Sequence, residues 1–334
     1  MGRPASAVHK QKRENAVTYQ EPFHEGELEA QRRSGESDAA AGNSPMIGNR
    51  IMSGAVQFIR EQPMAIIGSR DPDGRLWSSM LFGRPGFLDP SPDRRSLQIR
   101  IDQDLQDFQD PLWRNITSDR QVGILVIELA SRRRLRINGN LTLAAPDLLT
   151  IQVEESFVNC PKYIQRRSIQ LDRGIALLPS AVAEKTSDRL QPEQREFVSR
   201  ADTFFVTSAH PTRGLDTSHR GGNTGFIEVV DDKTLRIPDY QGNSMFNTIG
   251  NLLVDPRAGL LFPDFEGHSN LQIAGTAEVL WAQPTNRDGD TGRSWMFHIE
   301  QIRQARMQAA LQAHFIDYSP FNPATGSTPD HCPL

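Results

Sequence analysis

The stretch TSHRGGNTGF, residues 217–226, shares a pattern of serine, glycine and phenylalanine with SSMLFGRPGF, residues 78–87. Ser79 corresponds to Ser218 and Gly83 to Gly222, and both stretches close on Gly-Phe in the same register. Glycine allows backbone conformations and close contacts that other residues do not, so a shared glycine pattern indicates a shared local structure. The chain therefore contains two copies of one structural element.

The two copies extend well beyond this stretch. Sliding the chain on itself by 139 residues matches about thirty positions without a gap, and the offset then falls to 138 and finally to 136. Such small changes are typical of loops that differ in length between common strands. A chain of 334 residues has room for two similar halves. Among the matched pairs are Phe58 with Phe197, Ser69 with Ser208, Pro72 with Pro211, Phe87 with Phe226, Asn115 with Asn251, and Gly139 with Gly275.

Each copy is predicted to be rich in β-structure. Short runs of Ile, Leu, Val and Phe alternate with Pro, Gly, Asp and Asn, which is the pattern of strands and turns. Five or six such strands predict a small antiparallel barrel. One short helix is expected inside each copy. In the second copy, Met245, Ile249 and Leu252 or Leu253 have the spacing that would face the barrel.

A helix is also expected after each barrel. Apolar residues near helical spacing predict an amphipathic helix over residues 294–315 and a shorter one over residues 146–158. The predicted organisation is a partly flexible extension at 1–50, a first repeat at 51–168, a linker at 169–194, a second repeat with the C-terminal helix at 195–318, and a tail at 319–334. The predicted fold is mainly β with flanking α.

Composition and charge narrow the functional classes. The net charge is −4 and the arginines are scattered, which argues against nucleic acid as the principal partner. Two cysteines, Cys160 and Cys332, cannot form a disulfide framework, so a reducing cytoplasm fits best. No apolar run is long enough to span a bilayer, and the first residues do not resemble a signal peptide.

Three segments resemble the pyridoxamine 5'-phosphate oxidase-like flavoproteins of the FMN-binding split-barrel fold. The longest is RGGNTGFIEVVDDKTLRIPDYQGNSMFNTIGNLLVDPRAGLLF, residues 220–262. FHEGELEAQ (residues 23–31) and NCPKYIQ (residues 159–165) resemble a tandem subgroup. The resemblance implies FMN as cofactor, held in a cleft between two barrels. A duplicated chain supplies both barrels, so two tandem split β-barrels would form an intramolecular pseudo-dimer.

The candidate FMN-binding residues come mostly from the second copy. Arg220 could reach a phosphate or a ring carbonyl, and Gly221 and Gly222 would let a strand approach the flat ring. Residues 239–248 place polar groups at the start of a helix, where unpaired N–H groups favour an anion. The full candidate set is Ser218, Arg220, Gly221, Gly222, Gln241, Asn243, Ser244, Asn247, Thr248, Lys162 and Tyr163.

Two departures bear on this site. Many members of the family have Arg or Lys where this chain has Ser244 and Met245, so the positive partner of the phosphate is left open; Lys162 is one candidate. In the first copy, Leu81 and Phe82 replace Arg220 and Gly221, and residues 102–110 carry four aspartates that would repel a phosphate. One FMN per chain is therefore expected.

Several of these residues also have a simpler, purely structural interpretation. Gly221 and Gly222 could merely form a bulge or turn, and Lys162 could be an ordinary solvated lysine. Cys160 is interpreted as a packed small hydrophobe, with a reactive thiol as the alternative. The basic cluster SRRRLR, residues 131–136, is interpreted as a charged hairpin edge, with contact to an anionic ligand as the alternative.

A metal site is not expected. His24, Glu25 and Glu27 lie close together in the sequence, but no further histidine partner is apparent, and such a mixed set is a weak site.

The predicted function is that of an FMN-dependent oxidoreductase with an unidentified substrate, in which the flavin carries hydride or electron transfer. NAD(P)H or an electron-transfer protein could be a partner, and tandem chains could pair again as a homodimer. No side chain stands out as a catalytic acid or base. The alternatives are a protein of the same fold that uses a deazaflavin or haem, and a flavin-binding module without catalysis.

Overall fold

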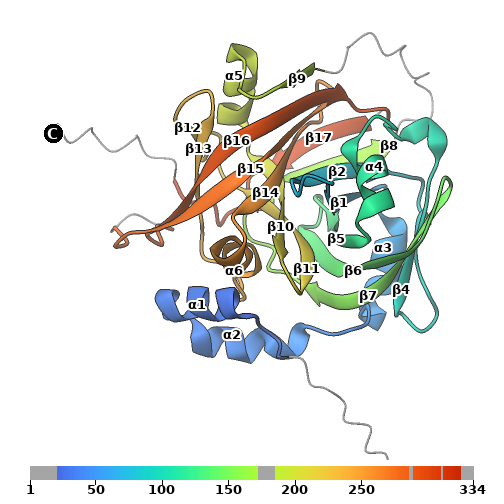
Figure 1. Cartoon of the computed structure of the whole chain (residues 1–334), viewed down its shortest axis with the longest axis horizontal. Helices are drawn as coiled ribbons and strands as arrows, with labels where there is room; N and C mark the ends of the chain where they lie inside the picture. Colours follow the sequence, from blue (N-terminus) through green and yellow to red (C-terminus); the bar gives the residue numbers. More distant parts are fainter. Residues whose placement is uncertain (1–20, 172–184, 286–288, 310, 325–334) are drawn as a thin grey trace, which may run out of the picture.

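The computed structural model describes residues 21–171, 185–285, 289–309 and 311–324, arranged as in Figure 1. The described chain begins with α1 (Glu25–Ser34), α2 (Ser37–Asn43) and the short helix η1 (Ser44–Met46). Helix α1 packs against α6 (Asn247–Val254) of the second repeat, as Figure 1 shows. The part of the predicted extension at residues 21–50 is thus folded against the body, and residues 1–20 lie outside the described residues.

The seven strands of the first repeat form a single sheet, and one helix, α4, is inserted between β4 and β5. Its elements are η2 (Ser53–Ala55), α3 (Val56–Glu61), β1 (Met64–Arg70), β2 (Leu76–Phe82), β3 (Leu88–Pro90), β4 (Ser96–Arg100), η3 (Gln103–Leu105), α4 (Pro111–Ser118), β5 (Gln121–Glu128), β6 (Arg133–Ala145) and β7 (Leu148–Val158).

The second repeat copies this order. Its elements are α5 (Pro192–Arg200), β10 (Thr203–His210), β11 (Gly214–Gly221), β12 (Glu228–Val229), β13 (Thr234–Pro238), α6, β14 (Arg257–Asp264), β15 (Ser269–Trp281) and β16 (Arg293–Arg306). Strand β9 (Lys185–Ser187) pairs with β16, and β8 (Arg166–Leu171) pairs with β17 (Leu311–Asp317) in a separate ribbon.

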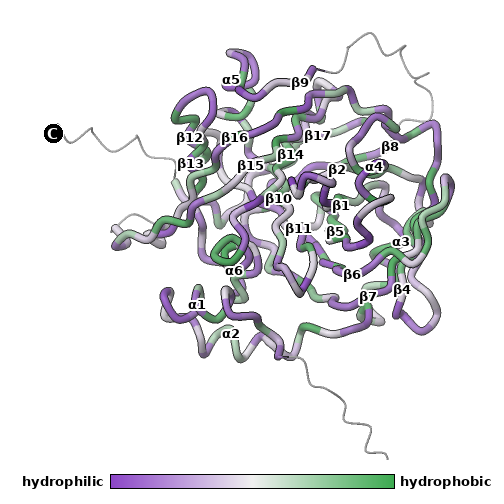
Figure 2. Tube along the Cα trace, in the orientation of Figure 1, coloured by the Kyte–Doolittle hydropathy of each residue, from purple (hydrophilic) through white to green (hydrophobic). Residues whose placement is uncertain are grey.

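The strand order confirms the two tandem barrels. It is β2-β1-β5-β6-β7-β4-β3 in the first sheet and β11-β10-β14-β15-β16-β13-β12 in the second, position for position the same. Each barrel encloses its own apolar cluster. Figure 2 shows hydrophobic segments on the strands and on α6, while α1 and α5 are largely hydrophilic. In the described part of the chain, no helix has the length and apolar character needed to cross a membrane.

Both helices predicted after the barrels are wrong. Residues 146–158 fall mostly in β7, residues 294–306 fall in β16, and residues 311–315 fall in β17. In β16, Trp295, Phe297 and Ile299 are buried while His298 and Glu300 are exposed, which is the alternation of a strand. Apolar residues at every second position also include pairs four apart, so helical spacing was present by coincidence.

The inserted helices are where the sequence predicts them, as α4 and α6. Ile249 and Leu252 enter the core of the second barrel, and Leu253 packs partly against it. Met245 differs from the expectation: it precedes α6 and packs with Phe23 outside the barrel. The N-terminal segment therefore takes up an apolar residue that the barrel was expected to use.

The repeats meet through a close backbone contact that occurs twice. A Cβ added at Gly123 on β5 would lie 2.8 Å from the carbonyl oxygen of Leu215. One added at Gly259, the equivalent position on β14, would lie 2.4 Å from that of Leu76. Real Cβ atoms do not approach backbone this closely, so each strand needs glycine where it crosses the hairpin of the other repeat.

Two hydroxyl groups repeat the same symmetry. Ser78 Oγ donates to the carbonyl oxygen of Gly259 at 2.9 Å, and Thr217 Oγ1 donates to that of Gly123 at 2.8 Å. A third apolar cluster, with residues of both repeats such as Met64 and Phe205, fills the rest of the interface. The two barrels therefore form a covalent pseudo-dimer.

We predict that Gly259→Ala destabilises the protein by roughly 1–3 kcal/mol, because the new methyl group would overpack the backbone at Leu76. The midpoint of urea unfolding measures this. Gly42→Ala is the control, since a Cβ there meets nothing within 4 Å. Equal midpoints for the two variants would contradict the close contact.

Candidate functional site

A cavity of about 80 Å³ lies between the two repeats. Its walls come from β6 and residues 159–163 of the first repeat, and from β11, residues 238–244 and the start of α6 in the second. Strand β6 reaches this place because it packs against β11. The cavity therefore depends on the contact between the repeats, as the split-barrel expectation requires.

Most of the candidate residues are brought together here. Eight line the cavity: Arg220, Gly221, Asn243, Ser244, Asn247, Thr248, Lys162 and Tyr163. The other three lie just behind it. Ser218 accepts a hydrogen bond from Thr248, while the carbonyl groups of Gly222 and Gln241 accept from Gln165 and Tyr163. Binding of a cofactor by these residues remains a prediction.

The two glycines allow close packing within the protein. A Cβ at Gly221 would lie 2.2 Å from the carbonyl oxygen of Tyr163, and one at Gly222 would lie 2.6 Å from the ring of Phe226. Both glycines are therefore required by packing within the protein. Gly221 lets the segment around Tyr163 close over β11 and form one wall of the cavity.

Two arginines of the basic cluster line the cavity. Arg134 and Arg136 lie two residues apart on β6, so their side chains share one face of the strand. The preferred interpretation of residues 131–136 as a hairpin edge is wrong for these two. Arg133, the residue before Arg134, is exposed and lies over the ring of Phe58. The alternation of exposed and buried positions along the strand could have indicated that Arg134 and Arg136 share a face. The sequence did not indicate that this face packs against the second repeat.

The cavity has an excess of buried positive charge. Arg134 donates to the carbonyl oxygens of Cys160 and His219, and no carboxylate bonds it among the described residues. Burial lowers the pKa of Arg134 to about 9, and repulsion by Arg136 and Arg220 contributes. Burial also lowers the pKa of His219, again with repulsion from the arginines. An anion placed here would relieve this repulsion.

Several donors in the walls have no partner within the described structure. They are Nε of Arg136, Nε of Arg220 and, on a neutral ring protonated there, Nε2 of His219. Helix α6 begins beside them without a side-chain cap, because Phe246 occupies the N-cap position. The first-turn N–H groups of a helix without a cap attract anions. The donor set therefore fits a ligand with anionic and carbonyl oxygens.

A chain of ion pairs holds the far side of the cavity. Arg220 donates to Asp239 at 2.9 Å, and Asp239 also accepts from Arg293 at 3.0 Å. Arg293 then reaches Glu36 at 3.3 Å, and Glu36 accepts from the Ser244 hydroxyl at 2.6 Å. Both carboxylates are thus engaged by arginine, and the N-terminal segment supplies one of them.

The equivalent place in the first repeat is nearly filled. A cavity of about 20 Å³ lies beside Ser79–Phe82 and α4. Asn270 stands where the other cavity has Arg134, and Met80 and Leu81 stand where it has His219 and Arg220. Asp110 lies at its wall. This place has no counterpart of Arg134 or Arg220, and Asp107 and Asp110 line it beside Arg306, so it suits an anion less well.

The segment FHEGE gains a histidine partner that the sequence did not indicate. His24 and His210 have ring centroids 4.1 Å apart, and one ligand atom from each of His24, Glu25 and His210 lies within 4.8 Å of the others. Such a set of side chains can bind a transition metal. The protonation of the rings decides between metal binding and hydrogen bonding.

The hydrogen bonds favour a structural role. Nδ1 of His24 accepts from the backbone N–H of Gly26 at 3.2 Å, and Nδ1 of His210 accepts from that of Thr212 at 3.3 Å. A neutral imidazole that accepts at Nδ1 carries its proton on Nε2. The Nε2 atoms therefore donate, one to Asn251 at 2.9 Å and the other to the Glu25 carboxylate at 3.1 Å.

Glu27 is the buried acid of this segment. Its carboxylate accepts from the backbone N–H of His24 at 3.0 Å and from Nδ2 of Asn247 at 2.5 Å. Burial raises the pKa of Glu27 to about 8, and the neighbouring carboxylates Glu155 and Asp216 add to the rise. Asn247 in turn lines the cavity.

We predict that stability depends on pH through Glu27. The unfolded chain ionises this carboxyl near 4.5 and the folded one near 8, so folding takes up a proton in between. Stability contributed by Glu27 is therefore lost as the pH rises from about 4.5 to about 8. Relative to Glu27→Gln, the wild type should lose on the order of a few kcal/mol across this range, measured by urea unfolding. A constant difference would contradict the shift. Burial lowers the pKa of His24 to about 4, so this ring adds a pH dependence of its own in both proteins.

Comparison with known proteins finds a family model that matches the second repeat. Residues 190–317 match the family model described as pyridoxamine 5'-phosphate oxidase. A search of curated proteins finds no match.

Solved structures show limited similarity over about one repeat. HupZ from Group A Streptococcus is 16% identical, with a TM-score of 0.29, over 36% of this chain and 94% of its own. A Clostridium acetobutylicum protein of the pyridoxinephosphate oxidase family is 16% identical, with a TM-score of 0.26, over 37% and 92%. An FAD-binding protein from Mesorhizobium loti is 12% identical, with a TM-score of 0.25, over 37% and 97%. The match to the pyridoxamine 5'-phosphate oxidase family thus covers residues 190–317, which lie almost entirely in the second repeat.

Proposed function

We propose that the chain binds FMN in the cavity between its repeats and acts as an oxidoreductase. The observation that carries this proposal is the cluster of Arg134, Arg136 and Arg220 at the cavity, which has more positive charge than the nearby carboxylates neutralise. A phosphorylated ring with carbonyl groups supplies the anion and the acceptors that these donors lack. The family match over residues 190–317 supports a ligand of this class.

The protein's own residues would bind and orient the cofactor. Arg134 and Arg136 would donate to anionic or carbonyl oxygens, and the start of α6 would offer backbone N–H groups to the phosphate. These groups compensate for the missing cations at Ser244 and Met245. Tyr163 and Tyr240, whose ring centroids lie 5.1 Å apart, form an aromatic wall beside them. When bound, FMN would supply the hydride or electron transfer.

The test is the spectrum of the purified chain and its response to a reductant. Flavin absorbance, its loss with NADH or NADPH, and its return in air are the expected results. A deazaflavin or haem spectrum would show that the cofactor is one of these alternatives and not FMN. A bound flavin that no reductant reaches would support the alternative of a non-catalytic module.

We predict one FMN per chain, because the equivalent place on the other side of the interface has Asn270 and Met80 where this cavity has Arg134 and His219. Titration of the cofactor-free chain, followed by flavin fluorescence, gives the stoichiometry. Two sites of similar affinity would contradict the asymmetry between the repeats.

We predict that Arg134→Gln weakens FMN binding by roughly tenfold or more, because a charged donor without a carboxylate partner is lost. Arg133→Gln is the matched control, since this neighbour on the same strand is exposed and lies over Phe58. The dissociation constants of both variants and the wild type decide the result. Equal values for the two variants would place the ligand elsewhere.

A further inference from the structure

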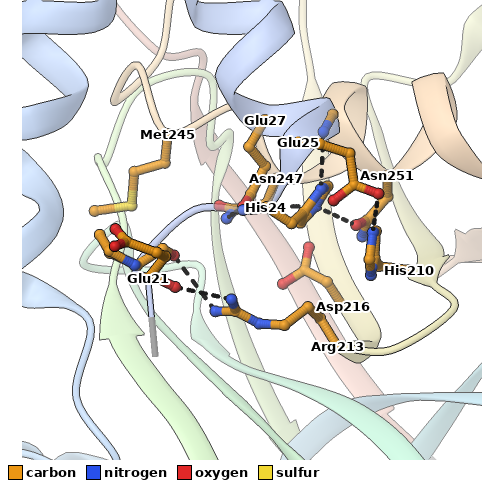
Figure 3. A network of polar contacts seen from close by, with 12 residues as sticks. Glu21, His24, Glu25, Glu27, His210, Arg213, Asp216, Met245, Asn247 and Asn251 are labelled. Atoms are coloured by element: carbon orange, nitrogen blue, oxygen red, sulfur yellow. Dashed lines mark hydrogen bonds and ion pairs between the residues drawn. The ribbon is translucent and has the colours of Figure 1, made fainter. Parts of the chain in front are cut away.

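The N-terminal helix α1 reaches the cavity through a buried relay of hydrogen bonds. Glu27 on α1 accepts from Nδ2 of Asn247 at 2.5 Å, and Oδ1 of Asn247 accepts from Nη1 of Arg136 at 2.9 Å. The same Arg136 nitrogen donates to Asp216 at 2.9 Å. Figure 3 shows Glu27 beside Asn247, with Asp216 close by. Three parts of the chain thus meet behind one guanidinium group.

The orientation of the Asn247 amide is decided by its neighbours. An arginine can only donate, so Arg136 requires the amide oxygen of Asn247 on its side. The NH₂ group of Asn247 then faces Glu27, whose Oε1 accepts it and so stabilises this orientation. If the amide turned over, its NH₂ group would face the donors of Arg136 across a buried gap, at a cost in free energy.

Further contacts hold helix α1 in place besides this relay. A Cβ at Gly26 would lie 2.1 Å from the carbonyl oxygen of Gly250, so α1 and α6 are in backbone contact. The side chains of His24 and Glu27 form a reciprocal cap at the start of α1. Gln31, further along α1, donates to the carbonyl oxygen of Met245 at 3.3 Å. The carboxylate of Glu27 is thereby presented to Asn247 at a fixed distance.

We propose that Glu27 is a positioning residue for the ligand cavity: by orienting the Asn247 amide, it holds Arg136 where an anionic ligand meets it. The part of this inference that concerns the ligand rests on the proposed function; the part that concerns the orientation of Asn247 and Arg136 does not. This proposal gives the segment FHEGE, residues 23–27, a role in the cavity between the repeats.

The substitution Glu27→Gln should disturb the hydrogen-bond relay and leave the fold of α1 intact. The cap at the start of α1 tolerates glutamine at this position, because the side-chain oxygen can still accept from the backbone N–H of His24. The amide nitrogen then faces Asn247, which must turn its oxygen toward it. The NH₂ group of Asn247 is thereby directed at Arg136, which is displaced.

Affinity for FMN provides the first measurement. We expect Glu27→Gln to weaken binding about tenfold, as when a partner of a buried charged group is lost. In an Asn247→Ala background the same substitution should add little, because the relay is already broken. Glu25→Gln is the control: it lies on the same turn, is exposed, and contacts His210 instead. Additive effects of Glu27→Gln and Asn247→Ala would overturn the relay.

Crystal structures of the ligand-free wild type and Glu27→Gln provide the second measurement. The expected result is loss of the contact between Arg136 and Asn247 in the variant, with α1 unchanged. An unchanged contact would overturn the proposal whether or not FMN binds. A wild type that binds no FMN while the contact is lost in Glu27→Gln would refute the proposed function and leave the positioning role supported.

Discussion

The backbone contact between the repeats, at Gly123 and Gly259, is the constraint on which the rest of the structure depends. Each glycine lets one β-strand cross the hairpin of the other repeat without a side chain between them. The hydroxyls of Ser78 and Thr217 bond the carbonyl groups exposed by this approach. With the sheets this close, side chains from β6 of one repeat reach the hairpin and helix of the other. The cavity and its charges follow from that distance.

A duplicated chain begins with two equivalent interfacial places, and this chain has made them different. On one side, Arg134 and Arg220 line a cationic cavity. On the other, Asn270 and Leu81 occupy the same positions, and Asp107 and Asp110 lie at the wall. Because each place takes residues from both repeats, one substitution in each repeat is enough to change its character. Fusion into one chain makes this possible, since identical subunits would have to keep both places the same.

The N-terminal segment joins this arrangement as a supporting layer. Its carboxylates do not enter the cavity; they bond the residues that do. Glu36 bonds Ser244 and Arg293, and Glu27 bonds Asn247. Buried acids of this kind stabilise a site by fixing the orientation of amides and guanidinium groups, at the cost of burying a carboxyl group that is easier to keep neutral.

The sequence by itself determined the two barrels, the inserted helices and most of the second repeat's contribution to the cavity, because glycine spacing and strand patterns are local properties. It did not distinguish β16 from a helix, since apolar residues at every second position also contain helical spacings. Only the tertiary structure decided that Arg134 and Arg136 are buried in the cavity, that Gly221 makes room for the Tyr163 carbonyl, and that FHEGE lies behind Asn247. The physical reason is that these contacts join residues that are far apart in the sequence, and local patterns carry no information on which surfaces will meet.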